Sequence, residues 1–254
     1  KNNPDEIEKN SRGVITIPLV VHVVHCTSKP AQNVPDNLIQ EQITVLNRDY
    51  AGLNPHSMGA FPASMKANTE IQFCLAKRDP KGKATTGIER RAITDVTVVF
   101  GKDNQMKHYS TRGLDQWDSK KYMNIWICDL VTGLMGYAGL PTSPLSADYG
   151  LVIDYDVIAS RYGGVGTHEL GHNFNLYHPW GPNKDNLNCT DSDLCNDTPN
   201  QAKQTSGVPS GVRTDACTKT SPGIMWMNFQ DYTNADGMAN FTPDQKKRML
   251  ALFE

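Results

Sequence analysis

The residues that could do chemistry are densest in the segment 167–178, which contains His168, Glu169, His172 and His178. On an α-helix, His168 and His172 are four positions apart and project from one face, so both ring nitrogens can bind one metal ion. Histidines at this spacing suit Zn²⁺. Glu169 lies beside the first histidine but off its axis, where its carboxylate can take a proton from a water that the metal activates. The segment therefore predicts a zinc site that makes water a nucleophile.

The third histidine needs a change of chain direction. His178 lies six residues beyond His172, too far round to share the same helical face. The helix must therefore end, and the chain must turn sharply through a residue that tolerates a positive φ. Asn175 is the candidate, because asparagine follows glycine in its preference for the left-handed region. We expect a turn at Asn175 that brings His178 to the metal as the third ligand.

The order of these residues resembles the metzincin signature H-E-x-x-H-x-x-G-x-x-H, with Asn175 in the place of the usual glycine. Other segments narrow the resemblance to the pappalysin family of metzincins, which are zinc metallopeptidases. They are Asp197-Thr198-Pro199, residues 227–232 and 240–245 downstream, and residues 71–76, 78–80, 87–88 and 124–128 upstream. The resemblance extends over about residues 14 to 253.

The resemblance and the order of the apolar segments imply an α/β (α+β) fold of the metzincin type. We expect one catalytic domain over residues 14–254. Its upper, N-terminal lobe, about residues 14–174, should hold a mixed twisted sheet with long helices. A loop-rich lower lobe, about residues 175–254, should follow, with a cleft between the lobes. Residues 1–13 are polar, and we expect a flexible terminal segment or a prosegment remnant, because relatives are made as zymogens.

Hydrophobic periodicity predicts the elements that must position the site. Apolar residues alternate or follow one another in five segments, predicted as strands at 14–25, 71–78, 91–100, 122–130 and 150–157. Apolar residues recur at helical spacing over 37–50, which predicts a helix there. Thr242 as cap and Pro243 at the first position predict a last helix that continues to Phe253.

The resemblance also implies roles for residues after the zinc segment. Tyr232 would donate a hydrogen bond from its phenol to the oxyanion that forms on the scissile carbonyl. Gln230 stands where the family has the methionine below the metal, and a buried amide there needs partners. Some relatives select a basic residue with an aspartate in the next segment, where this chain has Ala235, with Asp236 beside it. These two positions leave a preference for basic residues open.

Two further features follow from the loop after the zinc segment. Oxygen-bearing side chains are dense there, and such ligands suit Ca²⁺. The resemblance places calcium ligands at Asp193, Asn196 and Thr198, whereas a solvated acidic loop is the alternative. It also implies a disulfide between Cys189 and Cys217.

The cysteine count and the composition bound the class of protein. Six cysteines fit an oxidising compartment. Cys26, Cys74 and Cys128 lie in apolar segments, where each could be a buried thiol or part of a disulfide. Cys195 has no obvious partner. With 25 basic and 27 acidic residues and no long apolar run, we expect no binding to nucleic acid and no membrane insertion.

Together these features predict a zinc-dependent endopeptidase that is secreted, acts on peptides or proteins and is a monomer. No signal peptide is present at Lys1, which fits a processed product. The resemblance implies that an extended peptide could pair with a strand edge at residues 134–141 or 148–153, whereas an interior strand and a surface loop are the alternative. One alternative is a catalytically silent zinc protein that binds partners in the same cleft, which Gln230 keeps open. Another is a hydrolase of small amides.

Overall fold

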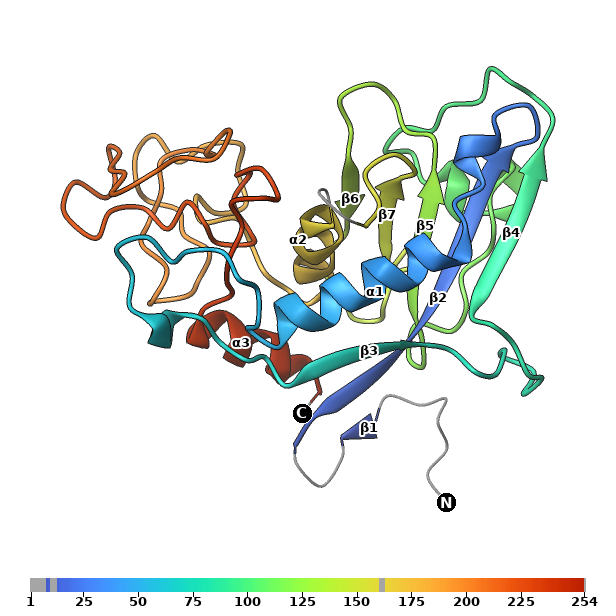
Figure 1. Ribbon diagram of the computed structural model, residues 1–254, viewed down its shortest axis with the longest axis horizontal. Helices are drawn as coiled ribbons and strands as arrows, with labels where there is room; N and C mark the ends of the chain where they lie inside the picture. Colours follow the sequence, from blue (N-terminus) through green and yellow to red (C-terminus); the bar gives the residue numbers. More distant parts are fainter. Residues whose placement is uncertain (1–7, 10–12, 160–162, 254) are drawn as a thin grey trace. The chain divides into compact units, whose positions relative to one another are not determined.

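The computed structural model describes residues 8–9, 13–159 and 163–253 (Figure 1). The fold is mixed α/β, as the sequence predicts, with parallel and antiparallel strands and few helices. Most of the segment expected to be flexible, residues 1–13, lies outside the described residues.

The chain folds into two compact units. The first contains residues up to 47 and residues 70–173, and the second contains residues 48–69 and 174–254. The lobes expected from the sequence divide the chain once, near residue 174. The compact units differ in that residues 48–69 belong with the C-terminal part of the chain.

A mixed sheet of seven strands forms the framework of the first unit, within the residues that the structure describes (Figure 1). The parallel strands are β2 (Ile15–Cys26), β3 (Ile71–Leu75), β4 (Ile88–Ile93), β5 (Met123–Cys128) and β7 (Leu151–Asp154). The antiparallel strands are β1 (Glu8–Lys9), which pairs with β2, and β6 (Gly136–Ala138), which pairs with β7. The order β1-β2-β5-β7-β6 places β6 at an edge of the sheet.

Two helices belong to this framework. Helix α1 (Asp36–Tyr50) carries a buried apolar stripe that includes Ile39, Ile43 and Leu46. Helix α2 (Gly164–Asn173) packs on β6 and β7. Short 3₁₀ helices lie at Pro30–Gln32, Ala63–Met65, Gln105–Lys107, Tyr109–Thr111 and Ala251–Phe253.

Most predicted elements are present, with shifts of a few residues at their ends. The prediction of a strand at 91–100 is partly wrong, because β4 occupies residues 88–93 and the chain then turns. The carboxylate of Asp95 accepts hydrogen bonds from the backbone N–H (3.0 Å) and hydroxyl (2.6 Å) of Thr97. This local turn interrupts the strand despite the valines that follow. Strand β6 lies in the segment 134–141 that the resemblance indicates as a strand edge, but hydrophobic periodicity does not predict it, because three residues are too few for a pattern to show.

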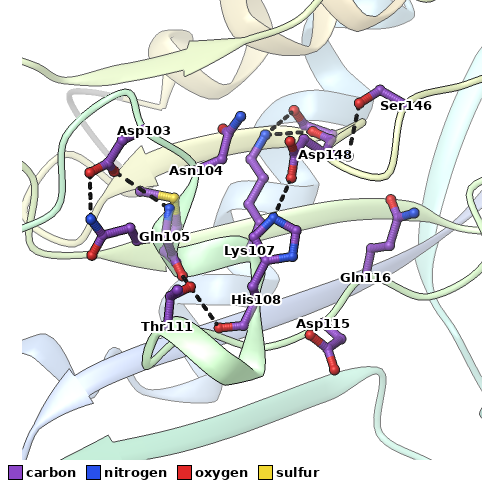
Figure 2. A network of polar contacts seen from close by, with 12 residues as sticks. Asp103, Asn104, Gln105, Lys107, His108, Thr111, Asp115, Gln116, Ser146 and Asp148 are labelled. Carbon is purple, nitrogen blue, oxygen red and sulfur yellow. Dashed lines mark hydrogen bonds and ion pairs between the residues drawn. The ribbon is translucent and has the colours of Figure 1, made fainter.

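Lys107 is a buried cation that packs against the sheet (Figure 2). Its ammonium donates to the backbone carbonyls of Asp148 (2.6 Å) and Gly150 (3.3 Å), in the segment before β7. The same nitrogen lies 5.1 Å from the ring centre of Trp126 in β5 and 5.2 Å from that of Tyr137 in β6. Burial lowers the pKa of Lys107 to about 8. The Lys107 side chain thus contacts β5, β6 and the segment that leads into β7.

The second unit is rich in loops and contains helix α3 (Pro243–Leu250). The predicted cap is present as a capping box, in which the hydroxyl of Thr242 accepts from the backbone of Gln245, and the Gln245 side chain accepts from the backbone of Thr242. Asp197 accepts from the Thr242 hydroxyl (2.6 Å) and from the backbone N–H of Asp244 (2.8 Å). The segment with Asp197 therefore holds the start of α3, where a carboxylate is favoured.

The cysteines in the structure agree with the expected pairing. Cys189 and Cys217 form a disulfide with 5.3 Å between their α-carbons. The other four are not in disulfides: Cys26, Cys74, Cys128 and Cys195. Across the described part of the chain, none of the helices has the length and apolar character needed to span a membrane.

Candidate active site

Glycines at the start of helix α2 lie against side chains of α1. A Cβ at Gly166 would be 2.7 Å from the Nε2 of Gln42, and one at Gly163 would be 2.9 Å from a methyl group of Val45. Gln42 also donates to the carbonyl of Gly163 (2.9 Å) and accepts from the backbone of Ala159 (2.8 Å). These contacts fix the start of the helix that carries the first two histidines.

His168 and His172 project from one face of α2, as their spacing predicts. Their Nε2 atoms are 3.1 Å apart, and their ring planes are perpendicular. His168 is buried and His172 is half-buried. Both rings therefore direct the same nitrogen toward a common point.

The predicted turn at Asn175 is present. Asn175 has a φ of +67°, which ends the helical path. Arg248 of α3 donates from Nε to the Asn175 carbonyl (2.5 Å) and from its guanidinium to the side-chain oxygen (3.3 Å). After the turn, one ring nitrogen each of His168, His172 and His178 lie within 4.8 Å of one another.

The three histidines fit a zinc ion by their chemistry. Two nitrogens that bind one zinc at about 2.0–2.1 Å in a tetrahedral site lie roughly 3–4 Å apart. The nitrogens of His168 and His172 are 3.1 Å apart, and that of His178 lies within 4.8 Å of both. Three protein ligands leave a fourth position for water, which is the arrangement of catalytic zinc sites. Among the described residues, no other group of histidine, cysteine and carboxylate side chains is brought together in this way.

Glu169 is buried beside this cluster, with 8% of its surface exposed. Burial raises the pKa of Glu169 to about 8, and a cation bound nearby would oppose this effect by favouring the carboxylate. Strand β6 begins against this side chain, since a Cβ at Gly136 would lie 3.2 Å from Cγ of Glu169. The absence of a side chain at Gly136 lets the edge strand approach the glutamate.

Tyr232 lies beside the third histidine and is 46% exposed. Its ring is perpendicular to that of His178, with centres 4.9 Å apart, and is 5.2 Å from the ring of Trp180. Trp180 stacks on His178 with ring centres 4.5 Å apart. The buried carboxylate of Asp231 accepts from the backbone of Tyr232 (2.7 Å) and of Thr205 (2.8 Å), which holds this turn in place.

Gln230 is fully buried in the same turn. Its backbone N–H donates to the side chain of Asn228 (2.9 Å). Asn228 in turn exchanges two amide hydrogen bonds with Gln245, of 2.9 and 3.0 Å. The turn is therefore supported by polar side chains.

The loop with the expected calcium ligands contains two buried oxygens for which the described residues supply no well-formed hydrogen bond, Oδ2 of Asp193 and Oγ1 of Thr198. The other oxygen of Asp193 accepts from the backbone of Cys195 (3.0 Å). Burial raises the pKa of Asp193 to about 7. The Thr198 hydroxyl opposes this rise in pKa through a side-chain hydrogen bond to Asp193. Asn196 is exposed between them. Buried oxygens with so few donors suit a hard cation.

The remaining expected positions lie at the surface of the second unit. Ala235 is half-buried and Asp236 is exposed. Reasoning from the sequence did not identify Trp180 or Gly136 as parts of the site. An aromatic residue two positions after His178 was a weak signal for Trp180. No local signal existed for Gly136, whose contact is with a residue far along the chain.

A helix that brings two histidines and a buried glutamate to a third histidine, packed on a mixed sheet with an antiparallel edge strand, defines a metalloprotease of the metzincin class. Residues 107–254 match the sequence profile of the family described as pregnancy-associated plasma protein-A. The chain belongs to this family, which is the pappalysin family indicated by the sequence.

Solved and curated relatives agree with this assignment. Mature mirolysin of Tannerella forsythia, solved with a cleaved peptide, is 38% identical with a TM-score of 0.86, over 95% of this chain and 92% of that one. A promirolysin mutant from the same organism is 39% identical with a TM-score of 0.85, over 94% and 80% of the two chains. An extracellular metalloprotease of Colletotrichum graminicola is 30% identical over 94% of this chain and 76% of its own length.

Proposed function

We propose that this metalloprotease is a zinc-dependent endopeptidase in which Glu169 acts first as general base and then as general acid. The observation that carries the proposal is the cluster of three histidine nitrogens within 4.8 Å, with the buried Glu169 adjacent in sequence to His168. Zn²⁺ bound there would polarise the scissile carbonyl and lower the pKa of a water molecule. Glu169 takes the proton of the attacking water and delivers it to the leaving amine.

Tyr232 is proposed to stabilise the oxyanion. Its phenol is on a partly exposed side chain whose ring contacts His178, so a hydroxyl donor lies near the proposed metal position. A donor directed at charge that develops during the reaction lowers the barrier more than it strengthens substrate binding.

The peptide is proposed to pair with the edge strand β6. Of the two segments expected from the sequence, 134–141 contains β6, whereas 148–153 leads into β7, which pairs with both β5 and β6. Only β6 therefore offers a strand edge for main-chain hydrogen bonds. The cleaved peptide in the mirolysin structure supports a peptide as substrate. The cleavage sites measure whether a basic substrate residue is preferred, which Ala235 and Asp236 leave open.

Calcium is proposed as a second metal, held by Asp193 with oxygens near Asn196 and Thr198. The support is the pair of buried oxygens at Asp193 and Thr198, for which the described residues supply no well-formed hydrogen bond. Calcium should raise the melting temperature of the parent, and Asp193→Asn should abolish this rise. An equal rise in both proteins would place the ion elsewhere.

Secretion and a zymogen form are proposed from the relatives. The relative in Colletotrichum graminicola is named an extracellular metalloprotease, and one solved relative is a promirolysin. The disulfide fits an oxidising compartment. We propose a monomer, which sedimentation at several concentrations would test.

The first experiment is cleavage of a diverse peptide library, with and without a zinc chelator, with new termini mapped by mass spectrometry. Chelator-sensitive internal cleavage is expected. Glu169→Ala should keep its zinc while its kcat falls by about 10²–10⁴-fold. Near-parental activity in this variant would reject Glu169 as the base. No cleavage by the zinc-loaded parent would instead favour the catalytically silent binding protein.

A further inference from the structure

Asn173 joins the end of the histidine-bearing helix to the edge strand. It is the last residue of α2, follows His172 directly and is fully buried. Its side-chain Nδ2 donates to the carbonyl of Gly139 (2.9 Å), the residue after β6. Its own carbonyl accepts from the hydroxyl of Tyr149 (2.5 Å), which lies shortly before β7. Asn173 therefore holds both ends of the β6–β7 connection.

Strand β6 needs such an anchor because its pairing is short. Three residues pair with β7, in the register 136 with 153, 137 with 152 and 138 with 151. A three-residue edge strand is weakly held by pairing alone. Its middle residue, Tyr137, is fixed by Lys107 and by a hydrogen bond from its hydroxyl to Asn104 (3.0 Å). Its far end, at Gly139, is fixed by Asn173.

The two ends of β6 differ in what they contact. Gly136 lies against Glu169, so the strand begins at the reacting centre. Gly139 lies at the other end, where the chain leaves the strand. A peptide paired with β6 therefore extends from the scissile bond toward Gly139 on one side only.

We infer that Asn173 is a positioning residue for extended peptide substrates, which fixes the edge strand relative to the helix through the carbonyl of Gly139. This inference rests on the proposed endopeptidase function. Gly139 is exposed, so water can satisfy its carbonyl when the amide is removed. Loss of the side chain should free the end of the strand rather than leave a buried carbonyl unpaired.

The test compares Asn173→Ala with Asn47→Ala. Asn47 is a matched anchor in the same unit, because its side chain donates to the carbonyl of Phe73 (2.9 Å) and accepts from the backbone N–H of Phe73 (2.7 Å), in β3. Peptides are lengthened separately on each side of the scissile bond. In Asn173→Ala, KM should rise by about fivefold or more for peptides lengthened on one side, with kcat within about twofold. In Asn47→Ala, KM for peptides lengthened on either side should equal that of the parent.

Two readouts do not depend on activity. Amide hydrogen exchange at residues 136–139 should accelerate in Asn173→Ala but not in Asn47→Ala. Zinc content should equal that of the parent. Unchanged exchange and KM, equal losses on both sides, or loss of zinc would overturn the inference. If the parent cleaves no peptide, the proposed function fails, and hydrogen exchange still decides whether Asn173 positions the strand.

Discussion

At the scale of single residues, the site combines groups whose roles differ by their surroundings. Glu169 is buried beside the histidine cluster. Burial favours its protonated form, so a nearby cation is needed to keep the carboxylate that accepts a proton. Tyr232 is partly exposed and contacts His178 through its ring, which places a phenol beside the third histidine. The two residues are therefore proposed for different steps, proton transfer and charge stabilisation.

Replacement of Tyr232 by Phe should separate these steps. The ring contacts with His178 and Trp180 are retained, and only the hydroxyl donor is lost. We expect kcat to fall by about 10- to 100-fold with little change in KM, because the donor acts mainly in the transition state. Steady-state kinetics on one peptide measure both constants. A rise in KM at constant kcat would assign the hydroxyl to substrate binding instead.

At the scale of elements, the edge strand depends on side chains that come from outside the sheet. Lys107 connects β5, β6 and the segment before β7 through one ammonium group. The cation is stabilised there by two carbonyls and two aromatic rings, and it is destabilised by loss of water. The second effect is larger, since the pKa of Lys107 is lowered to about 8.

This lowered pKa predicts a pH dependence of stability. Between pH 8 and the ordinary pKa of lysine, about 10.5, the unfolded chain binds more protons at this position than the folded one. The contribution of Lys107 to the free energy of unfolding should therefore rise with pH across this window, by up to about 3 kcal/mol. Denaturant unfolding of the parent and Lys107→Met at several pH values measures the difference. A difference that stays constant would contradict the prediction.

At the scale of the whole molecule, the chain divides into two units with different means of support. The first unit is organised around a sheet whose central strand is almost entirely buried. The second is rich in loops and relies on a capping box, buried amides and the disulfide between Cys189 and Cys217. A loop-rich unit gains more from a covalent link, because its unfolded chain has more freedom to lose.

Removal of the disulfide should therefore affect the second unit selectively. Cys189 and Cys217 are 28 residues apart, and closing a loop of this length stabilises by about 2–4 kcal/mol. The double variant Cys189→Ser with Cys217→Ser should expose amides of residues 174–254 to faster hydrogen exchange, with the strands of the first unit unchanged. Equal acceleration in both units would show that they unfold together. Cys74→Ser serves as a control, because this cysteine forms no disulfide.

The sequence by itself determined the features that depend on neighbours a few residues away. The spacing of His168 and His172 places them on one helical face, asparagine at 175 permits the positive φ that turns the chain, and Thr242 with Pro243 begins the last helix. The long apolar run of β2 likewise predicts its strand. Each of these signals is local, because backbone geometry and capping act over one or two turns.

Only the tertiary structure decided the features that depend on partners far along the chain. Gly136 contacts Glu169, Asn173 holds Gly139, and Lys107 is buried against Trp126, although none of these pairs is marked by local pattern. The grouping of residues 48–69 with 174–254 is of the same kind. A short edge strand and a buried charge are stable only after the packing that surrounds them exists, so periodicity and propensity cannot reveal them.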